Sequence, residues 1–320
     1  MRDPVRPTLS RRGFAASACL LAACAGRPAK QPLRGASGGA ARTFAGDPRV
    51  GQYVSNGWTF ATSSFWVSGP AGLVLVDTQF LPSLGLEAAD LAERATGRRV
   101  TTAYVLHANP DKFNGTAALQ QRGVDVLTSQ QVLDAMPPIH EKRVDAFYER
   151  YKPDYPLAMP TPKAFGAATA TQSAAGLTLT AHVLGPGCSE AHVVLQFEDQ
   201  VFVGDLVANG AHSWLEIGKT DAWLDRLTEI EAMKPRWVHP GRGPSGGPEL
   251  LGRQRAYLEE VIALVAAERP GGEPDEAALA RVRAELERRH PDLRFPVFLA
   301  IGLPAEWRRQ AAARAVADPG

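Results

Sequence analysis

The loop that ends the segment Thr101–Gly115, TTAYVLHANPDKFNG, carries the side chains best suited to chemistry. A run rich in β-branched residues stops at His107, and three further polar side chains follow it, at Asn109, Asp111 and Lys112. Imidazole and carboxylate groups at this spacing can bind a metal ion or exchange protons with a substrate. Because α/β folds place chemistry where a strand ends and a helix begins, we expect a site in this loop.

The elements around the loop follow from the hydrophobic pattern. Alternating or short apolar runs predict strands at 58–67, 72–77, 124–127, 177–184, 193–197, 201–203 and 236–239. Apolar spacings of three and four predict helices at 84–96, 222–233, 248–268 and 275–289. Strand and helix blocks that alternate in this way favour an α/β domain with helices outside packed sheets. Four polar turns end predicted strands, at 76–78 (VDT), 185–189 (GPGCS), 204–206 (GDL) and 239–243 (HPGRG).

Together with the loop, these turns resemble the five motifs of the metallo-β-lactamase superfamily, in the family's order, over roughly residues 50–250. The loop resembles the family signature His-x-His-x-Asp-His followed by Gly, with His107 and Asp111 retained. The resemblance implies an αββα sandwich with the site at one edge of the two sheets. It also implies a metal-dependent hydrolase in which zinc supplies hydroxide.

The resemblance assigns seven metal-ligand positions, and four of them depart from the family pattern. At the first metal position stand His107, Asn109 and Cys188. At the second stand Asp111, Lys112, Asp205 and Arg242. An Asn amide is a poor zinc ligand, whereas Cys and His are good ones. Lys112 and Arg242 bring positive charge to the place where the family holds a divalent ion.

The charges of these residues predict whether the second metal position can hold an ion. Two carboxylates that face each other repel unless a positive charge lies between them. A unit charge pair about 4 Å apart contributes roughly 4 kcal/mol at an effective dielectric near 20. Lys112 and Arg242 can compensate the retained carboxylates, and a zinc ion would meet like charge. We therefore predict that the second metal site is lost and that the protein needs no cofactor there.

The first position leaves alternatives open. His107 and Cys188 could hold one zinc ion with Asn109, with water, or with Asp111 or Asp205. Cys188 could instead be a nucleophile paired with His107, its thiol pKa lowered by the neighbouring cations, with Asp111 completing the catalytic group. The alternative without a chemical role is that Cys188 is a small buried residue.

Three further features could border the site. His212 lies on the loop after Asp205 and is a candidate substrate contact. His192 could line the cleft, with a structural role at a strand edge as the alternative. The Tyr- and Pro-rich segment 130–175, with helical stretches at 130–136 and 141–151, is either a lid or a packed surface excursion.

The N-terminal residues resemble an export signal. Ser10-Arg11-Arg12-Gly13-Phe14 precedes an apolar run, a pattern typical of twin-arginine signals. Leu21-Ala22-Ala23-Cys24 resembles a lipobox, which predicts a lipid anchor on Cys24 and a location facing the periplasm. A plain cleaved signal is the alternative. Cys188 would then be the one cysteine of the folded part, so no disulfide forms within the chain.

These observations divide the chain into a signal peptide (1–24), a Gly- and Pro-rich flexible linker (25–45), a metallo-β-lactamase-like domain (46–250) and a helical extension (251–320). A formal net charge of +1 gives no general attraction for nucleic acid. We predict an exported protein without the dinuclear zinc centre. Its partner would be a small anionic ligand, bound in a cationic cleft by Asn109, Lys112, Arg242 and His212. The alternative is a hydrolase of ester, thioester or lactam-type bonds that uses one metal ion or the Cys188–His107 pair.

Overall fold

The computed structural model describes residues 31–317. The predicted signal peptide, with Cys24, lies outside these residues. Within the described part, no helix is both long enough and apolar enough to cross a membrane.

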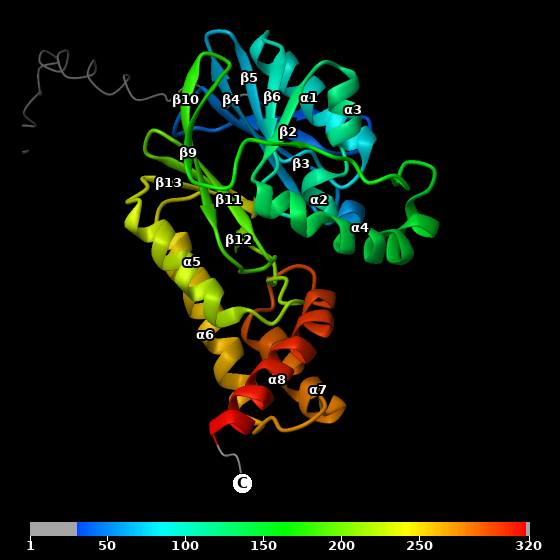
Figure 1. Cartoon of the computed structure of the whole chain (residues 1–320), viewed down its shortest axis with the longest axis vertical. Coiled ribbons are helices and arrows are strands. Elements are labelled where there is room, and N and C mark those ends of the chain that lie inside the picture. The colour runs from blue at the N-terminus through cyan, green and yellow to red at the C-terminus, as the bar shows by residue number, and fades with distance from the viewer. Residues whose placement is uncertain (1–30, 318–320) are drawn as a thin grey trace, which may run out of the picture. The chain divides into compact units, whose positions relative to one another are not determined.

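Two mixed β-sheets form the centre of the described chain (Figure 1). The first has eight strands in chain order, of which β5 to β8 run parallel and the others pair antiparallel. Its strands are β1 (Leu33–Arg34), β2 (Ala40–Thr43), β3 (Val50–Val54), β4 (Ser63–Gly69), β5 (Gly72–Val76), β6 (Val100–Tyr104), β7 (Asp125–Thr128) and β8 (Lys163–Ala164). The second has the order β13-β12-β11-β10-β9, with β12 and β13 parallel. Its strands are β9 (Ala170–Ala174), β10 (Leu177–Leu184), β11 (His192–Phe197), β12 (Gln200–Ala208) and β13 (Trp237–Arg242).

Helices cover the outer faces of both sheets (Figure 1). Helices α1 (Pro82–Thr96) and α3 (Thr116–Gln121) lie against the first sheet, and α5 (Thr220–Ala232) and α6 (Glu249–Ala267) lie against the second. The other helices are α2 (Pro110–Phe113), α4 (Gln130–Tyr151), α7 (Glu276–Arg289) and α8 (Val297–Ala317). The predicted αββα sandwich with additional C-terminal helices is confirmed.

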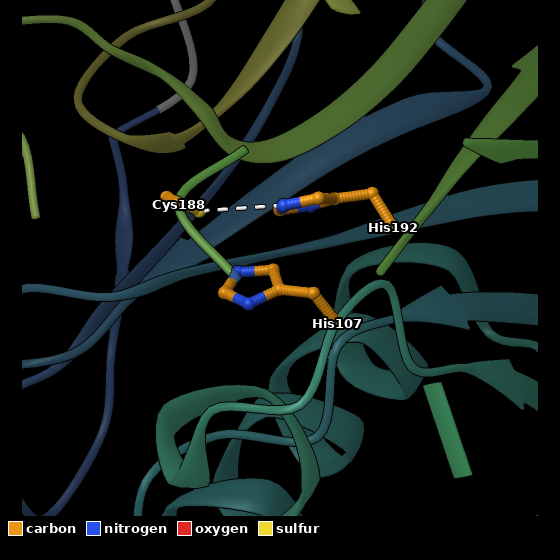
Figure 2. A group of neighbouring side chains, drawn as sticks. All are labelled: His107, Cys188 and His192. Carbon is orange, nitrogen blue, oxygen red and sulfur yellow. Dashed lines mark hydrogen bonds between the residues drawn. The ribbon is translucent and has the colours of Figure 1, made fainter. Parts of the chain in front are cut away.

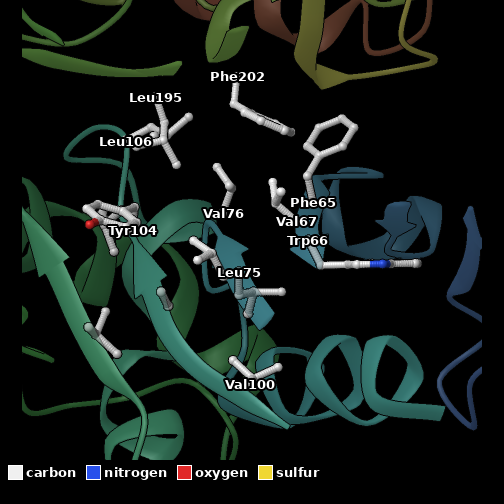
Figure 3. Packing of buried hydrophobic residues seen from close by; sticks show 14 of the residues in the cluster. Phe65, Trp66, Val67, Leu75, Val76, Val100, Tyr104, Leu106, Leu195 and Phe202 are labelled. Carbon is white, nitrogen blue, oxygen red and sulfur yellow. The ribbon is translucent and has the colours of Figure 1, made fainter. Parts of the chain in front are cut away.

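Apolar side chains fill the space between the sheets because strand residues alternate between the two faces. Phe65 on β4 meets Phe202 on β12, with ring centroids 5.5 Å apart. Leu106 and Leu195 belong to the same buried cluster (Figure 3). Each such side chain stabilises the fold by roughly 1.5–3 kcal/mol. This packing holds the strand ends from which the site is built.

The prediction of a flexible linker over 25–45 is wrong for its described part. Strand β2 pairs antiparallel with β3, and Ala41 is buried in the core. A Cβ at Gly39 would lie 2.3 Å from the Tyr53 hydroxyl, so small residues permit this close packing. Strand β2 pairs with β3 through backbone hydrogen bonds, and these do not require a particular side-chain composition. The Gly- and Pro-rich composition that predicted a flexible linker is therefore compatible with a strand.

The predicted boundary at residue 250 is also absent from the structure. Helix α6 begins at Glu249, and α6, α7 and α8 share one buried cluster with strands of the second sheet. Val203 on β12, Leu258 on α6 and Trp307 on α8 all belong to it. The C-terminal helices are therefore part of the same folded unit.

Helix α4 joins the two helical stretches predicted within 130–175. It runs through Pro137 and Pro138, and Ser129 caps its N-terminus by accepting a hydrogen bond from the Val132 amide. Phe147 and Tyr151 pack against Phe80, with ring centroids 5.3 and 4.9 Å away. The segment is therefore packed over the strand ends that carry the site.

Candidate functional site

A short backbone connection between the sheets brings His107 and His192 together. The Val193 amide donates to the Leu106 carbonyl at 2.7 Å, and His107 and His192 form an antiparallel bridge. The Leu106 amide also donates to Asp77 Oδ1 at 2.9 Å. The chain just after β6 is thereby tied to β11 and to the turn after β5, which fixes the start of the polar loop.

Helix α2 positions the next part of the loop. The Lys112 carbonyl accepts hydrogen bonds from the Thr78 amide at 2.7 Å and from the Thr78 hydroxyl at 2.9 Å. A Cβ at Gly115 would lie 2.0 Å from the Thr78 carbonyl oxygen, so only glycine allows this contact. Asp111 and Lys112 are therefore held against the turn after β5.

Four charged side chains form an ion-pair cluster at the second metal position of the predicted family. Its members are Asp111, Lys112, Asp205 and Arg242. Lys112 Nζ lies 2.9 Å from Asp205 Oδ1 and 3.3 Å from Asp111 Oδ2. Arg242 Nη2 lies 2.7 Å from Asp111 Oδ2, and Nη1 pairs with Asp205 Oδ2. The predicted compensation of two carboxylates by two cations is present.

The pKa values of the cluster keep it charged. Burial alone would raise the pKa of Asp205, but Arg242 and Lys112 hold it well below its usual range. The same two cations outweigh burial at Asp111 and lower its pKa. Asp77 differs, because burial raises its pKa to about 8 although Lys112 Nζ is 3.9 Å away. At neutral pH the cluster is therefore electrically balanced without a charge on Asp77.

The first metal position holds a different group, which we call the buried trio: His107, Cys188 and His192 (Figure 2). Their nearest ligand atoms lie within 4.8 Å of one another, and Cys188 Sγ is 3.8 Å from His192 Nε2. The Ser189 amide donates to His192 Nε2 at 3.2 Å. Neither ring nitrogen of His107 has a hydrogen-bond partner among the described residues.

The trio is uncharged. Burial lowers the pKa of His107 to about 4, and it lowers that of His192 well below its ordinary value. Burial also raises the pKa of the Cys188 thiol, and this outweighs the attraction of Lys112 and Arg242. The prediction that these cations activate the thiol is therefore wrong. Cys188 is 1% exposed, so it also fits the reading as a small buried residue.

A narrow cleft lies beside the ion-pair cluster; its cavity volume is about 30 Å³, within about 360 Å³ of space that includes the open mouth. Asn109, Asp111, Asp205 and Arg242 form its floor, and aromatic rings form its walls. The lining residues are Phe60, Phe80, Asn109, Pro110, Asp111, Arg143, Phe147, Asp205, Trp214, Arg242 and Phe298. The trio is not among them, so the cleft and the trio are separate environments.

Two predicted ligand-binding residues are placed elsewhere. Lys112 has no exposed surface and lies beneath the cleft floor. His212 is buried, and its Nδ1 lies 2.8 Å from the Tyr257 hydroxyl. The predictions that Lys112 and His212 contact a ligand are wrong for the same reason. Each side chain follows a strand end, but neighbouring elements pack over it and bury it.

The comparisons with known proteins agree with the motif order. Residues 57–242 match the profile of the metallo-beta-lactamase superfamily. The chain belongs to the metallo-beta-lactamase superfamily. It is 28% identical over 171 residues to "Metallo-beta-lactamase type 2" of Bacteroides fragilis, a match that covers 51% of this chain and 61% of that relative. The chain thus spans less than two thirds of the length of the curated relatives it matches.

Solved structures of superfamily members share the fold. The metallo-beta-lactamase from Pontibacter korlensis superposes with a TM-score of 0.53 at 21% identity, covering 67% of this chain and 96% of that one. The enzyme from Erythrobacter litoralis superposes with a TM-score of 0.55 at 16% identity, covering 72% and 100%. At these identities the likeness concerns the fold alone.

The superfamily implies a metal centre, and the ion-pair cluster does not fit one. Lys112 Nζ and the Arg242 guanidinium already lie against the carboxylates that would coordinate the ion. Ammonium and guanidinium groups have only donors and cannot ligate a metal. The predicted metal ligands Asp111 and Asp205 are therefore engaged at this position.

Several cleft and trio residues were not predicted. The sequence leaves His192 as a cleft residue or a structural histidine at a strand edge; it does not line the cleft, and only the pairing of β11 with the chain after β6 puts it beside His107. Phe60, Arg143, Trp214 and Phe298 had no assigned role. Their one sequence signal is aromatic and basic character in loops and helix ends, which does not indicate where those segments pack.

Proposed function

We propose that this protein is an exported member of the superfamily that has lost the dinuclear zinc centre and binds a small acidic molecule in its cleft. The observation that carries the proposal is the ion-pair cluster. Lys112 and Arg242 compensate the two carboxylates that a second zinc ion would need: Lys112 Nζ lies 2.9 Å from Asp205 and 3.3 Å from Asp111, and Arg242 Nη2 lies 2.7 Å from Asp111.

The lining of the cleft supports a ligand with a flat apolar body. Phe60, Phe147 and Phe298 offer ring faces or edges, and Trp214 lies 4.9 Å from Phe298 in an edge-to-face contact. Such rings favour aromatic partners by about 0.5–1.5 kcal/mol per contact beyond the area they bury. The Asn109 amide, which caps no helix amide, can hydrogen-bond a polar group on the ligand.

Charge at the wall supports an acidic group on that ligand. The ion-pair cluster of the floor is balanced, so it offers no net attraction. At the wall, Arg143 and Lys142 share a single carboxylate, Glu216, which leaves one positive charge in excess. Arg143 lines the cleft, whereas the Lys142 side chain is 60% exposed outside it. We therefore place the acidic group of the ligand beside Arg143 and not beside Lys112.

A β-lactam is a suitable probe because relatives of the chain are named metallo-beta-lactamases. Benzylpenicillin carries a phenyl ring, a lactam and a carboxylate. We expect it to change the fluorescence of Trp214 on binding and to be hydrolysed no faster with added zinc than in buffer. Trp214→Phe should abolish the fluorescence change. Zinc-dependent hydrolysis that disappears in His107→Ala would contradict the loss of the centre.

Lys142 provides a matched control for the charge argument. Arg143→Gln removes a charged hydrogen-bond donor from the cleft and should weaken binding of the acid about 10- to 100-fold, because such bonds contribute about 1.5–3 kcal/mol. Lys142→Gln should change affinity less than about threefold, in line with an exposed ion pair. The methyl ester of the probe should respond equally weakly to both variants. If Arg143→Gln and Lys142→Gln lose the same amount of affinity for the free acid of the probe, a direct role for Arg143 would be excluded.

The alternative hydrolase has less support. A nucleophile must reach the substrate, and neither Cys188 nor His107 lines the cleft. Burial keeps Cys188 as a thiol at neutral pH. Alkylation of native protein by iodoacetamide tests this directly, since a reactive Cys188 would be labelled at a rate comparable to free thiol.

Export is the part of the proposal that rests on the N-terminal motifs. Arg11→Lys with Arg12→Lys should retain the protein in the cytoplasm. Cys24→Ser should leave export intact and move the protein from the membrane fraction to the soluble periplasmic fraction. Membrane association that persists in Cys24→Ser would exclude the lipid anchor.

A further inference from the structure

The buried trio offers chemistry that the proposed function does not use. His107, Cys188 and His192 point toward one another, from the chain after β6, the turn after β10 and the start of β11 (Figure 2), and none of them lines the cleft. Each is at most 1% exposed. A thiol with two neutral imidazoles is a set of three good ligands for soft and borderline metal ions.

The spacing of the ligand atoms is close to what a metal ion needs. Zinc–nitrogen and zinc–sulfur bonds of about 2.0 and 2.3 Å hold ligand atoms roughly 3.3–3.7 Å apart in a tetrahedral site. Cys188 Sγ and His192 Nε2 are already 3.8 Å apart, and no pair within the trio exceeds 4.8 Å. Small rotations of the imidazoles would close the remaining gap.

The imidazole of His107 is a second, independent reason to expect a metal ion in the buried trio. A buried polar atom without a partner costs about 1–3 kcal/mol, so most such atoms in folded proteins are satisfied. Neither His107 nitrogen has a hydrogen bond within the described residues; the nearest carboxylate oxygen, Asp205 Oδ2, is 3.7 Å from Nε2. A metal ion at the centre of the trio would satisfy one of the two nitrogens and remove that part of the cost.

We propose that His107, Cys188 and His192 bind one thiophilic metal ion, copper(I) or zinc, in a structural site. This ligand set differs from the one that the superfamily resemblance assigns, because His192 takes the place of Asn109. The ion would be enclosed by residues that do not line the cleft, away from any substrate in the cleft. The proposal does not depend on which ligand the cleft binds.

Charge is balanced as the ion binds. The sulfur–metal bond replaces the sulfur–hydrogen bond of Cys188, and the proton leaves to solvent. With copper(I), the thiolate and the ion cancel, so the buried group stays neutral. With zinc, one positive charge remains beside Asp205. The Ser189 amide donates to His192 Nε2; once the ion takes that nitrogen, the amide becomes free to donate to the adjacent thiolate.

Metal content of the full chain tests the proposal. The purified protein is dialysed against zinc, or against copper(I) under a reductant, then desalted and analysed for bound metal. We expect about one ion per chain in at least one arm. His192→Gln should lose the ion, and its amide oxygen can still accept from Ser189. Asn109→Ala, at the family's position, should keep it. Circular dichroism of each variant verifies folding.

Cobalt(II) provides a readout that does not depend on the folding of variants. Bound cobalt shows a thiolate charge-transfer absorption when sulfur is a ligand, and we expect this band in the unmodified chain. Cys188→Ser should lose it and should lose the bound ion. That variant keeps Cys19 and Cys24, so metal held by those residues would persist.

Three results would overturn the proposal. One is a folded wild-type chain that binds no ion in either arm. Another is an ion that Asn109→Ala loses and His192→Gln keeps, which would indicate the family's ligand set. The third is metal and a cobalt–thiolate band that remain in Cys188→Ser.

Discussion

The ion-pair cluster around Arg242 and the buried trio around Cys188 occupy neighbouring positions and differ in charge, exposure and partners. Every member of the cluster is charged, and each charge has an opposite one within hydrogen-bond or ion-pair distance. The trio is neutral, and His107 has no partner among the described residues. The residues at the family's second metal position thus pair carboxylates with protein cations, whereas those at the first, together with His192, are metal-type ligands.

The largest expected effect comes from unbalancing the cluster. Asp205→Asn leaves Lys112 and Arg242 with one shared carboxylate in a buried place. Removing one partner of a buried ion pair typically costs about 3–5 kcal/mol of unfolding free energy. Urea denaturation should show a loss in this range. Asp125→Asn, which breaks the exposed pair with Lys163, is the control and should cost less than about 1 kcal/mol.

Restoring the family's histidines should convert the cluster back into a metal site. We expect the quadruple variant Asn109→His, Lys112→His, Cys188→His and Arg242→His to bind zinc, since the carboxylates of Asp111 and Asp205 then lack cations. Zinc at about 1,000 times its Kd should stabilise it by about 4 kcal/mol in thermal or urea unfolding.

The double variant Asn109→His with Cys188→His is the matched control for this restoration. It keeps Lys112 and Arg242, so it should hold at most one ion. Two zinc ions per chain in the double variant would show that the cations do not block the second position.

As the pH falls, the buried neutral imidazoles should lower the free energy of unfolding before the ion-pair cluster does. His239 is a remote example: its ring stacks on Phe202 at 4.4 Å, and burial lowers its pKa to about 3. The unfolded chain takes up this proton near pH 6.5, so stability is full above about pH 6.5 and falls toward the folded pKa. The paired carboxylates lose stability only below about pH 4.

His239→Gln should therefore flatten the pH dependence. The variant no longer takes up this proton on unfolding. The slope of the unfolding free energy against pH therefore falls by about 1.4 kcal/mol per pH unit between roughly pH 4 and 6. Chemical denaturation across this range provides the measurement. An unchanged slope would mean that His239 stays protonated in the fold.

Asp77→Asn should have the smallest effect, although Asp77 is as buried as Asp205. Its raised pKa of about 8 means that it is protonated at pH 7, and an Asn oxygen can still accept from the Leu106 amide. We expect a change below about 1 kcal/mol in unfolding free energy at or below about pH 4, where Asp77 keeps its proton in the fold and largely keeps it in the unfolded chain. Because a raised carboxyl pKa costs the wild type stability as pH rises from about 4 to 8, the variant should gain relative stability over that range. A loss as large as that of Asp205→Asn would show that Asp77 is ionised.

Much of the fold was accessible from the sequence, because motif order and periodicity report on local structure. Strand β5 and helix α1, which ends at Gly97 in a left-handed conformation, lie close to their predicted bounds, whereas β4 begins at Ser63, five residues after the predicted start, because Gly57–Thr59 forms a 3-10 helix. The pairing of Lys112 and Arg242 with two carboxylates followed from the family resemblance, which places the four residues at one site, together with the need to compensate two carboxylates there. Strands β1 and β2 were missed because backbone pairing leaves no strong sequence signal.

The site was less accessible because it depends on burial and on contacts between distant segments. The pKa of Cys188 depends on desolvation, which a sequence does not reveal. His192 meets His107 only through the bridge between the sheets. Phe298 reaches the cleft because α8 packs back toward the strand ends, and the helical period of a segment does not specify its partner.

The place of Phe298 also bears on when the cleft forms. Its ring lies 5.3 Å from the Arg242 guanidinium and 4.9 Å from the Trp214 ring, and it belongs to α8, the last helix of the described residues. Residues of α8 also share a buried cluster with β12. A chain that stalls before residue 298 would therefore lack both this part of the cleft wall and part of the packing of the second sheet, so the cleft is complete only once α8 has been synthesised.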